Sequence, residues 1–330
     1  MEKKKLFSIL FSFGILSLLI FSPACKSGLI SQEEDIVVPD ADCTDVNTVK
    51  DLSQRGACNE TLSFTNEVSM TESGGNRIIT SNSIPDHKVG LFGRVSGSLN
   101  PNAIAPVTDT YSIPMSPTFT GTPTALLNTS NGPQYELGIL LNGVLLDPEA
   151  AEPWPHDGIF SASTKNWEWN LDAMSINLGL DCNNAHVQPT GKYHHHGSPN
   201  LYIESINVSA NTMTLFGYAA DGFPIYHNYG YQDVNDANSG VKKLASSYRL
   251  KSGERPGDGS SAPCGNYSGI YTNDYEYVPG LGDLDECNGR TGITPEYPSG
   301  TYYYVITESY PFLPRCLMGV PSNDFKLGHR

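Results

Sequence analysis

The chain has 330 residues, a formal net charge of −15, only 17% charged residues, and 32 glycines with 23 prolines. This composition excludes a coiled coil or a long helical bundle, which need far more Ala, Glu, Lys and Leu. The negative charge argues against nucleic acid as a main partner, because phosphates would repel the chain. Of 18 tyrosines, 16 lie between Tyr193 and Tyr310. Since tyrosine is enriched in strands, this half of the chain is expected to be rich in β-structure.

The N-terminus has the pattern of an export signal. Three lysines at positions 3–5 precede an uncharged, mostly apolar run at 6–21, which is too short to span a membrane comfortably. A small residue then precedes Cys25, as in a bacterial lipoprotein signal, although Ser22 stands where such signals usually carry Leu. We therefore expect residues 1–24 to be removed and a lipid on Cys25 to anchor the protein to a membrane of the cell envelope, facing the periplasm or at the cell surface. Ordinary secretion with a free Cys25 thiol is the alternative.

Six further cysteines fit an exported protein, because oxidising compartments favour disulfides. No two of them have C-x-x-C spacing, which argues against a zinc ribbon or a thioredoxin motif. An acidic tether is expected at 25–59, and Cys43 and Cys58 are predicted to pair in a small loop at its end. The disulfide candidates are Cys43, Cys58, Cys182, Cys264, Cys287 and Cys316, and the last four leave three pairings open.

From residue 60 onward the pattern is one of short strands and turns. Asn142-Gly143 between apolar runs predicts a hairpin over 136–147 with a type I′ turn. Trp167, Leu171, Met174 and Leu178 have helical spacing and predict one short helix over 165–178. Other strands are expected at 76–80, 88–95, 201–208, 212–218 and 301–307, with a loop at 101–123. The predicted fold is mainly β: a single loop-rich, β-sandwich-like domain over 60–330, with one or few short helices and tied by disulfides.

Four of the eight histidines lie within 11 residues, at His186, His194, His195 and His196. In a strand, residues i and i+2 face the same side, so His194 and His196 share one face. His186 precedes a Pro-Thr-Gly turn that can fold it back beside them. Converging imidazoles are ligands for copper, zinc or nickel, so these three side chains are the candidate metal ligands. The alternative is a set of ring contacts in a tyrosine-rich core.

The chain resembles the YHYH family of exported proteins. The resemblance is carried by SNSIPDH (81–87), LNGVLLDPEAAEPW (141–154), LGLDCNNAHVQPTGKYHHHG (178–197), GYAADGFPIY (217–226), SSYRLKSGERP (246–256) and the segment 274–316, which ends in Pro-Arg315-Cys. It implies one exported domain and no defined reaction. In the motif that names the family, Tyr193 and both histidines are kept and His195 replaces the second tyrosine. In a later GTYHYV-like segment Tyr303 stands where His is usual, which puts a four-histidine site in doubt.

Oxygen-bearing side chains supply further metal candidates. Asp283, Asp285 and Glu286 lie in a glycine-bearing loop, an arrangement suited to Ca²⁺. A solvated acidic turn, or a carboxylate paired with Arg290 or Arg315, is the alternative. Asp221 and His227 are weaker candidates for the pocket of the histidine cluster.

Three functional hypotheses remain. The first is a lipid-anchored protein that binds Cu or Zn through the histidine cluster without an assigned reaction. The second is a metal-dependent hydrolase or a copper oxidoreductase in which Asp221 or Glu286 acts as a base. The third is a surface module for a glycan, a protein or a small molecule, with no metal, because tyrosine-rich grooves suit saccharide rings.

Overall fold

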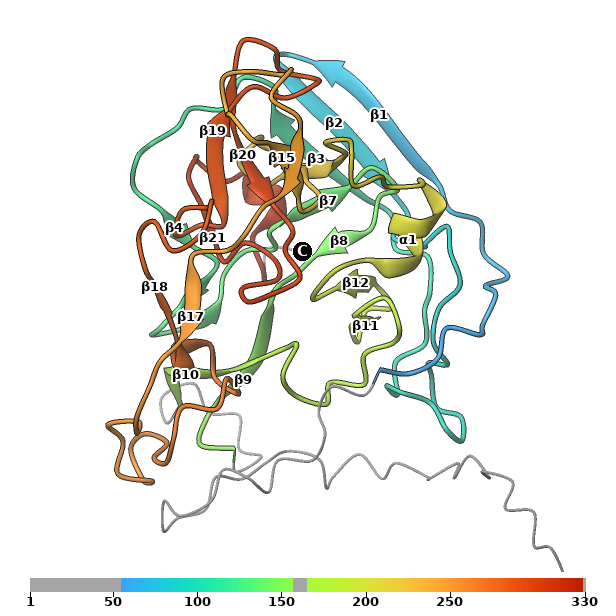
Figure 1. Cartoon of the computed structure of the whole chain (residues 1–330). Helices are drawn as coiled ribbons and strands as arrows, with labels where there is room; N and C mark the ends of the chain where they lie inside the picture. Colours follow the sequence, from blue (N-terminus) through green and yellow to red (C-terminus); the bar gives the residue numbers. More distant parts are fainter. Residues whose placement is uncertain (1–54, 157–164, 329–330) are drawn as a thin grey trace, which may run out of the picture.

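The structure is a computed structural model that describes residues 55–156 and 165–328. Its largest element is a mixed eight-stranded sheet (Figure 1). Most neighbours pair antiparallel, but β12 pairs parallel with β8, and β14 with β20. In spatial order the strands are β11 (Ala185–Val187), β12 (Tyr193–His195), β8 (Leu145–Leu146), β7 (Gly138–Leu140), β13 (Leu215–Ala219), β14 (Pro224–Tyr226), β20 (Thr301–Val305) and β19 (Gly289–Gly292).

A second, antiparallel sheet contains β1 (Val68–Ser73), β2 (Asn76–Ser81) and β3 (Asp109–Pro114). Ile79 and Tyr111 of this sheet join Ile139, Phe216 and Tyr304 of the large sheet in one buried apolar cluster. Burying the apolar faces of two sheets against each other gives a sandwich-like core. The predicted mainly β, loop-rich fold is confirmed.

The remaining elements are short. Two-stranded ribbons are formed by β9 (Glu149–Trp154) with β10 (Asn166–Asp172), β15 (Tyr229–Tyr231) with β16 (Val241–Lys243), β17 (Tyr248–Leu250) with β18 (Tyr275–Tyr277), β21 (Cys316–Leu317) with β4 (Thr124–Ala125), and β5 (Leu127–Asn128) with β6 (Gly132–Pro133). The helices are α1 (Asn200–Ser205) and the 3₁₀ turns η2 (Thr272–Asp274) and η3 (Asn323–Phe325). Across the described ranges, no helix combines the length and apolar character that a membrane crossing requires.

The helix predicted over 165–178 is wrong, because this segment contains strand β10. Trp167, Trp169 and Leu171 are all buried and also fit a period of two, which is the spacing that the structure uses. The strand predicted at 201–208 is also wrong, because α1 occupies most of it. Pro199 immediately precedes this helix, and Tyr202 is its buried residue.

The predicted hairpin over 136–147 is confirmed as β7 and β8, but its turn differs from the type I′ turn that we expected. Gly143 has a φ of 81°, whereas Asn142 is not among the residues with positive φ. The Gly143 amide donates to the carbonyl of Leu140, and the Leu140 amide donates to that of Val144. This is a three-residue loop that ends in a left-handed glycine, which is another common hairpin connection.

The strands predicted at 76–80, 212–218 and 301–307 are confirmed, with shifted ends, as β2, β13 and β20. The strand predicted at 88–95 is wrong, since only an isolated bridge between Glu60 and Val89 forms there. The expected loop at 101–123 contains β3, which completes the second sheet.

The predicted pairing of Cys43 with Cys58 is wrong, because Cys58 is bonded to Cys182. The segment at Gly56 lies beside residues 180–181, where its amide donates to the Leu180 carbonyl. The contact between these distant segments therefore determines the partner of Cys58, rather than the short chain distance between Cys43 and Cys58. A second disulfide joins Cys287 and Cys316, and Cys264 is disulfide-bonded as well.

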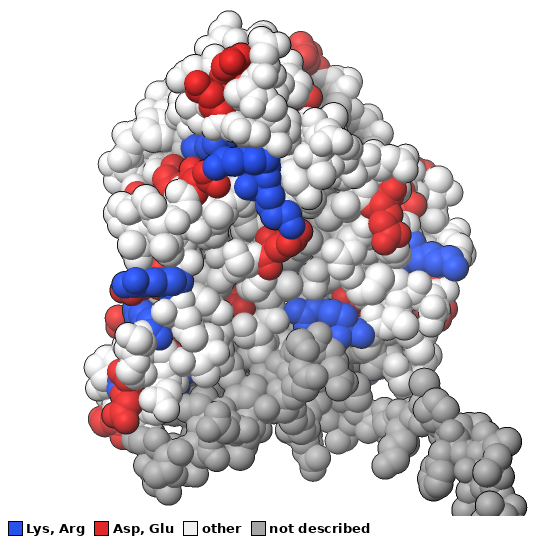
Figure 2. All heavy atoms as spheres, viewed as in Figure 1, with Lys and Arg blue, Asp and Glu red and all other residues white. Residues whose placement is uncertain are grey.

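Cys25, Cys43, the predicted signal at 1–24 and most of the predicted tether lie outside the described residues. The face drawn in Figure 2 carries scattered charges of both signs, often as opposite neighbours, on a mostly uncharged surface. On this face neither sign gathers into a broad patch.

Candidate metal centre

The histidine cluster is positioned by a short hairpin at one edge of the large sheet. β11 and β12 pair antiparallel with His186 directly opposite His194. The Gly191 amide donates to the Gln188 carbonyl and closes the turn between the two strands. The parallel pairing of His194 with Leu145 attaches this hairpin to the buried strand β8. The three imidazoles therefore belong to a framework of hydrogen-bonded strands.

The side chains of His186, His194 and His196 converge through their Nε2 atoms. The Nε2 of His196 lies 3.1 Å from that of His194 and 3.1 Å from that of His186. One ligand atom from each residue lies within 4.8 Å of the other two. The ring centroids are 4.8–4.9 Å apart. We refer to His186, His194 and His196 as the histidine triad.

The tautomer of His186 is set by its surroundings. Its Nδ1 lies 2.8 Å from the Leu178 carbonyl, which can only accept, so Nδ1 carries the hydrogen. The Nε2 of the neutral ring therefore presents its lone pair to the triad. Such a backbone contact is the usual way in which a metal-ligating imidazole is oriented.

Burial keeps the triad neutral at pH 7. His194 and His196 are 2% and 3% exposed, and His186 is partly buried. Burial lowers the pKa of His186, and it lowers the pKa of His194 and of His196 well below the ordinary value. Neighbouring imidazoles add to the lowering for both residues, and the nearby Arg315 adds to it for His196. The neutral form is the one that binds a metal.

Hydrogen bonding among the three rings cannot account for both short contacts. A ring nitrogen of a neutral imidazole holds either one hydrogen or one lone pair, so the His196 Nε2 cannot form a separate linear bond to each neighbour. A metal ion can accept lone pairs from several nitrogens at once. With metal–nitrogen bonds of about 2.0–2.1 Å, two nitrogens on a tetrahedral ion lie about 3.3 Å apart, close to the observed 3.1 Å. The donor set could therefore hold a metal ion.

The comparisons with known proteins agree with the resemblance seen in the sequence. The family model described as YHYH protein matches residues 110–319, well over half of the chain. The chain belongs to the YHYH family. No curated protein and no solved structure matches it. The assignment of a site in this YHYH protein therefore depends on its own geometry.

The two aromatic–histidine segments noted in the sequence lie far apart. Tyr193 and His195 are on β12, whereas Tyr303 is on β20, five strand positions away in the same sheet. At about 4.8 Å per strand, this separation is about 24 Å along the sheet, and Figure 1 draws β12 and β20 apart from each other. Tyr303 instead receives a hydrogen bond from Arg290 and packs against Tyr226. Position 303 is therefore remote from the triad along the sheet.

Asp221 and His227 also lie away from the triad. Asp221 accepts hydrogen bonds from the Tyr304 hydroxyl (2.6 Å) and the Gly319 amide (2.8 Å), and burial raises its pKa to about 6. The His227 ring stacks on Phe216 with centroids 5.0 Å apart. Both residues support the packing around β13, β14 and β20.

The acidic loop considered for Ca²⁺ has internal partners. Asp283 forms an ion pair with Lys242 at 2.5 Å. Asp285 accepts from the amides of Cys287 and Gly289 and from the Tyr302 hydroxyl. Within residues 55–156 and 165–328, the triad is the only set of three or more His, Cys, Asp or Glu side chains whose ligand atoms converge. The acidic loop, Glu286 included, forms no such set.

A buried cluster of carboxylates and Arg315 near the triad was missed by the sequence analysis. Arg315 bonds to Glu149 on β9 (3.1 Å) and to Asp172 on β10, and all three side chains are at most 10% exposed. Asp147 follows β8, and its amide donates to the His195 carbonyl beside the triad. Burial raises the pKa of Asp147 well above its ordinary value, and Glu136 adds to this. A carboxylate directly after the apolar strand at 145–146 was the signal available in the sequence.

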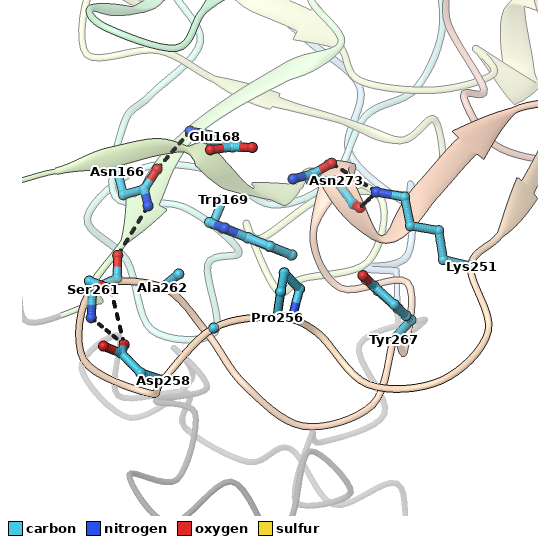
Figure 3. A pocket seen from close by; sticks show the side chains of 11 residues that line it. Asn166, Glu168, Trp169, Lys251, Pro256, Asp258, Ser261, Ala262, Tyr267 and Asn273 are labelled. Atoms are coloured by element: carbon cyan, nitrogen blue, oxygen red, sulfur yellow. Dashed lines mark hydrogen bonds between the residues drawn. The ribbon is translucent and has the colours of Figure 1, made fainter.

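A separate cavity of about 590 Å³ lies between β10 and the loop around residue 260 (Figure 3). Trp169 lies in the middle of the labelled side chains, with Glu168 on one side and Asn273 and Lys251 on the other. The Lys251 ammonium donates to the carbonyl and side-chain oxygens of Asn273. Trp169 is only 4% exposed, so it offers little ring surface for stacking on a sugar. The cavity is a polar pocket rather than an aromatic platform.

Proposed function

We propose that this YHYH-family protein is exported, lipid-anchored at Cys25 in the cell envelope, and binds a copper or zinc ion through the histidine triad. The observation that carries the metal-binding function is the convergence of three Nε2 atoms, two pairs of them at 3.1 Å, among neutral and mostly buried rings. Imidazole suits both metals, and the geometry of the donor set agrees with their bond lengths.

The proposed export is supported by the basic and apolar segments at 3–5 and 6–21, by the small residue before Cys25, and by the disulfides. Expression of the full chain in a bacterium with radiolabelled palmitate tests this part. Label is expected in the wild type and absent from Cys25→Ala. Labelling that persists in the variant would contradict lipidation at Cys25.

Metal analysis of natively purified, never-refolded protein tests the triad. The triad is expected to hold one equivalent of Cu or Zn per chain in the wild type, so the His194→Ala/His196→Ala double variant should contain one equivalent less. His227→Ala is a matched control, because it removes another buried histidine that lies outside the triad. A wild type without metal, or a double variant with unchanged metal, would contradict the proposed site.

A catalytic centre is the second candidate function. In the described residues the convergent group has three members, and a three-histidine set leaves a coordination position for water or a substrate, as in catalytic zinc sites. Hydrolysis by water activated on the metal is the reaction class that such a set supports. Turnover of ester, phosphoester or amide substrates that disappears in the double variant would support it, and activity retained in that variant would count against it.

A further inference from the structure

His195 points to the face of β12 opposite the triad and lies beside His87. His195 is fully buried, and the two ring centroids are 5.8 Å apart with planes at 46°. His87 belongs to the SNSIPDH segment, and the triad makes no use of it. The disulfide between Cys58 and Cys182 adjoins this pair, since Asn183 contacts both the Cys58 sulfur and His87.

The hydrogen bonds of this pair leave one ring nitrogen of each residue free. The Nδ1 of His195 donates to the Asn183 carbonyl at 2.9 Å, and the Nδ1 of His87 donates to the Lys88 carbonyl at 2.9 Å. The two amide hydrogens of Asn183 are directed to the Lys88 carbonyl and the Tyr193 hydroxyl. The Nε2 of His195 therefore carries a lone pair, and so does that of His87 in the tautomer whose Nδ1 donates to Lys88.

Neither of these Nε2 atoms has a hydrogen-bond partner, and both are shielded from solvent. A buried polar atom without a partner costs on the order of 1–3 kcal/mol, so two of them in adjacent rings call for a shared ligand.

A buried carboxyl group lies near this pair, and burial raises its pKa. Asp181 is fully buried and accepts hydrogen bonds from the Gly90 amide (2.9 Å) and the Tyr193 hydroxyl (2.8 Å). Its carboxylate interacts electrostatically with His87. Two neutral nitrogen donors beside a carboxylate are a favourable environment for a monovalent cation.

The separation of the ring centroids can be compared with the values expected for tetrahedral and linear coordination. With metal–nitrogen bonds of about 2 Å, two imidazoles on a tetrahedral ion have centroids about 5 Å apart, and two on a linear ion about 6 Å apart. The triad, at 4.8–4.9 Å, is close to the tetrahedral value. For two rings whose Nε2 atoms face one ion, the 5.8 Å separation of His87 and His195 is closer to the linear value.

We propose that His87 and His195 form a second metal site that binds Cu(I) through two imidazoles, independently of the triad. Cu(I) accepts two-coordinate, near-linear ligation, whereas Zn favours four ligands. The pair belongs to no group of three or more convergent His, Cys, Asp or Glu side chains in the described ranges. This site alternates with the triad along β12, because His194 and His196 face one side of the strand and His195 the other.

Anaerobic titration of the metal-free full chain with Cu(I), against a competing chelator, tests this site. Two tightly bound equivalents are expected in the wild type, one in His87→Ala and one in His194→Ala/His196→Ala. Wild-type protein that binds one equivalent, with His87→Ala also binding one, would overturn the second site while leaving the triad intact. That result is also the one expected if a buried water bridges the two nitrogens.

X-ray absorption of the Cu(I)-loaded His194→Ala/His196→Ala variant provides a second readout that does not depend on removing His87. Two nitrogen ligands in a near-linear arrangement are expected. A folded double variant that retains no Cu(I), or that binds it with three or more ligands, would overturn the proposal. Because these measurements report each site separately, loss of the triad and loss of this pair are distinguishable.

Discussion

His186 and His194 lie directly opposite each other in the antiparallel pair of β11 and β12, although seven residues separate them in the chain. This register places the imidazole of His186 beside those of His194 and His196, which face the same side of the chain at β12. The triad is thus a property of a tight hairpin, and its integrity depends on the hairpin's attachment to β8.

Removal of two triad ligands is expected to abolish tight binding of Zn(II). His194→Ala/His196→Ala should weaken the affinity by more than about 100-fold, since even residues that only orient ligands contribute about 10–100-fold. Calorimetric titration with Zn(II) measures this effect. His227→Ala should bind like the wild type, and a double variant with wild-type affinity would show that the metal binds elsewhere.

Tyr303→His is expected to leave metal binding by the triad unchanged. This variant introduces the histidine that the resemblance to the family implies at this position, but position 303 is on β20, five strands away from β12. Zn(II) titration should therefore give the wild-type stoichiometry and affinity. An additional equivalent, or a tighter triad, would indicate that the two segments communicate in a way that the strand order does not provide.

Arg315→Met is expected to lower the free energy of unfolding by about 3–5 kcal/mol, because it leaves Glu149 and Asp172 buried without their cation. Arg249→Met is the matched control. It removes an ion pair with Glu276 in which both side chains are well exposed, so its effect should stay below about 1 kcal/mol. Urea unfolding of both variants measures the difference, and equal effects would contradict the assigned role of Arg315.

The two disulfides that join described cysteines are expected to differ in their effect on stability. The bond between Cys58 and Cys182 closes a loop over a separation of 124 residues, and that between Cys287 and Cys316 over 29. Loop entropy predicts a loss of about 5 kcal/mol for Cys58→Ser/Cys182→Ser and about 3.5 kcal/mol for Cys287→Ser/Cys316→Ser. Thermal unfolding of the two double variants tests this order. A larger loss of stability in Cys287→Ser/Cys316→Ser than in Cys58→Ser/Cys182→Ser would contradict it.

Asp221 makes the folded state less stable as the pH rises. Its pKa is raised to about 6 in the folded protein, mainly by burial, so between pH 4 and 6 the folded state binds more protons than the unfolded state. Relative to Asp221→Asn, the wild type should lose up to roughly 3 kcal/mol between pH 4 and pH 7. Urea unfolding of both proteins at several pH values measures this difference, and a constant difference would show that the carboxyl is not destabilised by burial.

Much of this architecture could be predicted from local patterns. The apolar runs on either side of Asn142-Gly143 predict the hairpin, and the spacing of His194 and His196 places both on one face, because strand geometry fixes the direction of side chains at i and i+2. The Pro-Thr-Gly turn after His186 indicates that this residue returns to the same place. These features depend on residues close together in the chain, where backbone geometry dominates.

Only the tertiary structure decided the features that depend on distant contacts. The segment around Trp167 and Leu171 fits both a helical period and a period of two, and its pairing with β9 selects the strand. Cys58 bonds with Cys182 because the segment at Gly56 lies beside residues 180–181, not because the loop is short. Tyr303 is remote from the triad because of the order of strands in the sheet. Spacing along a chain sets which residues share a face, but packing between segments decides which faces meet.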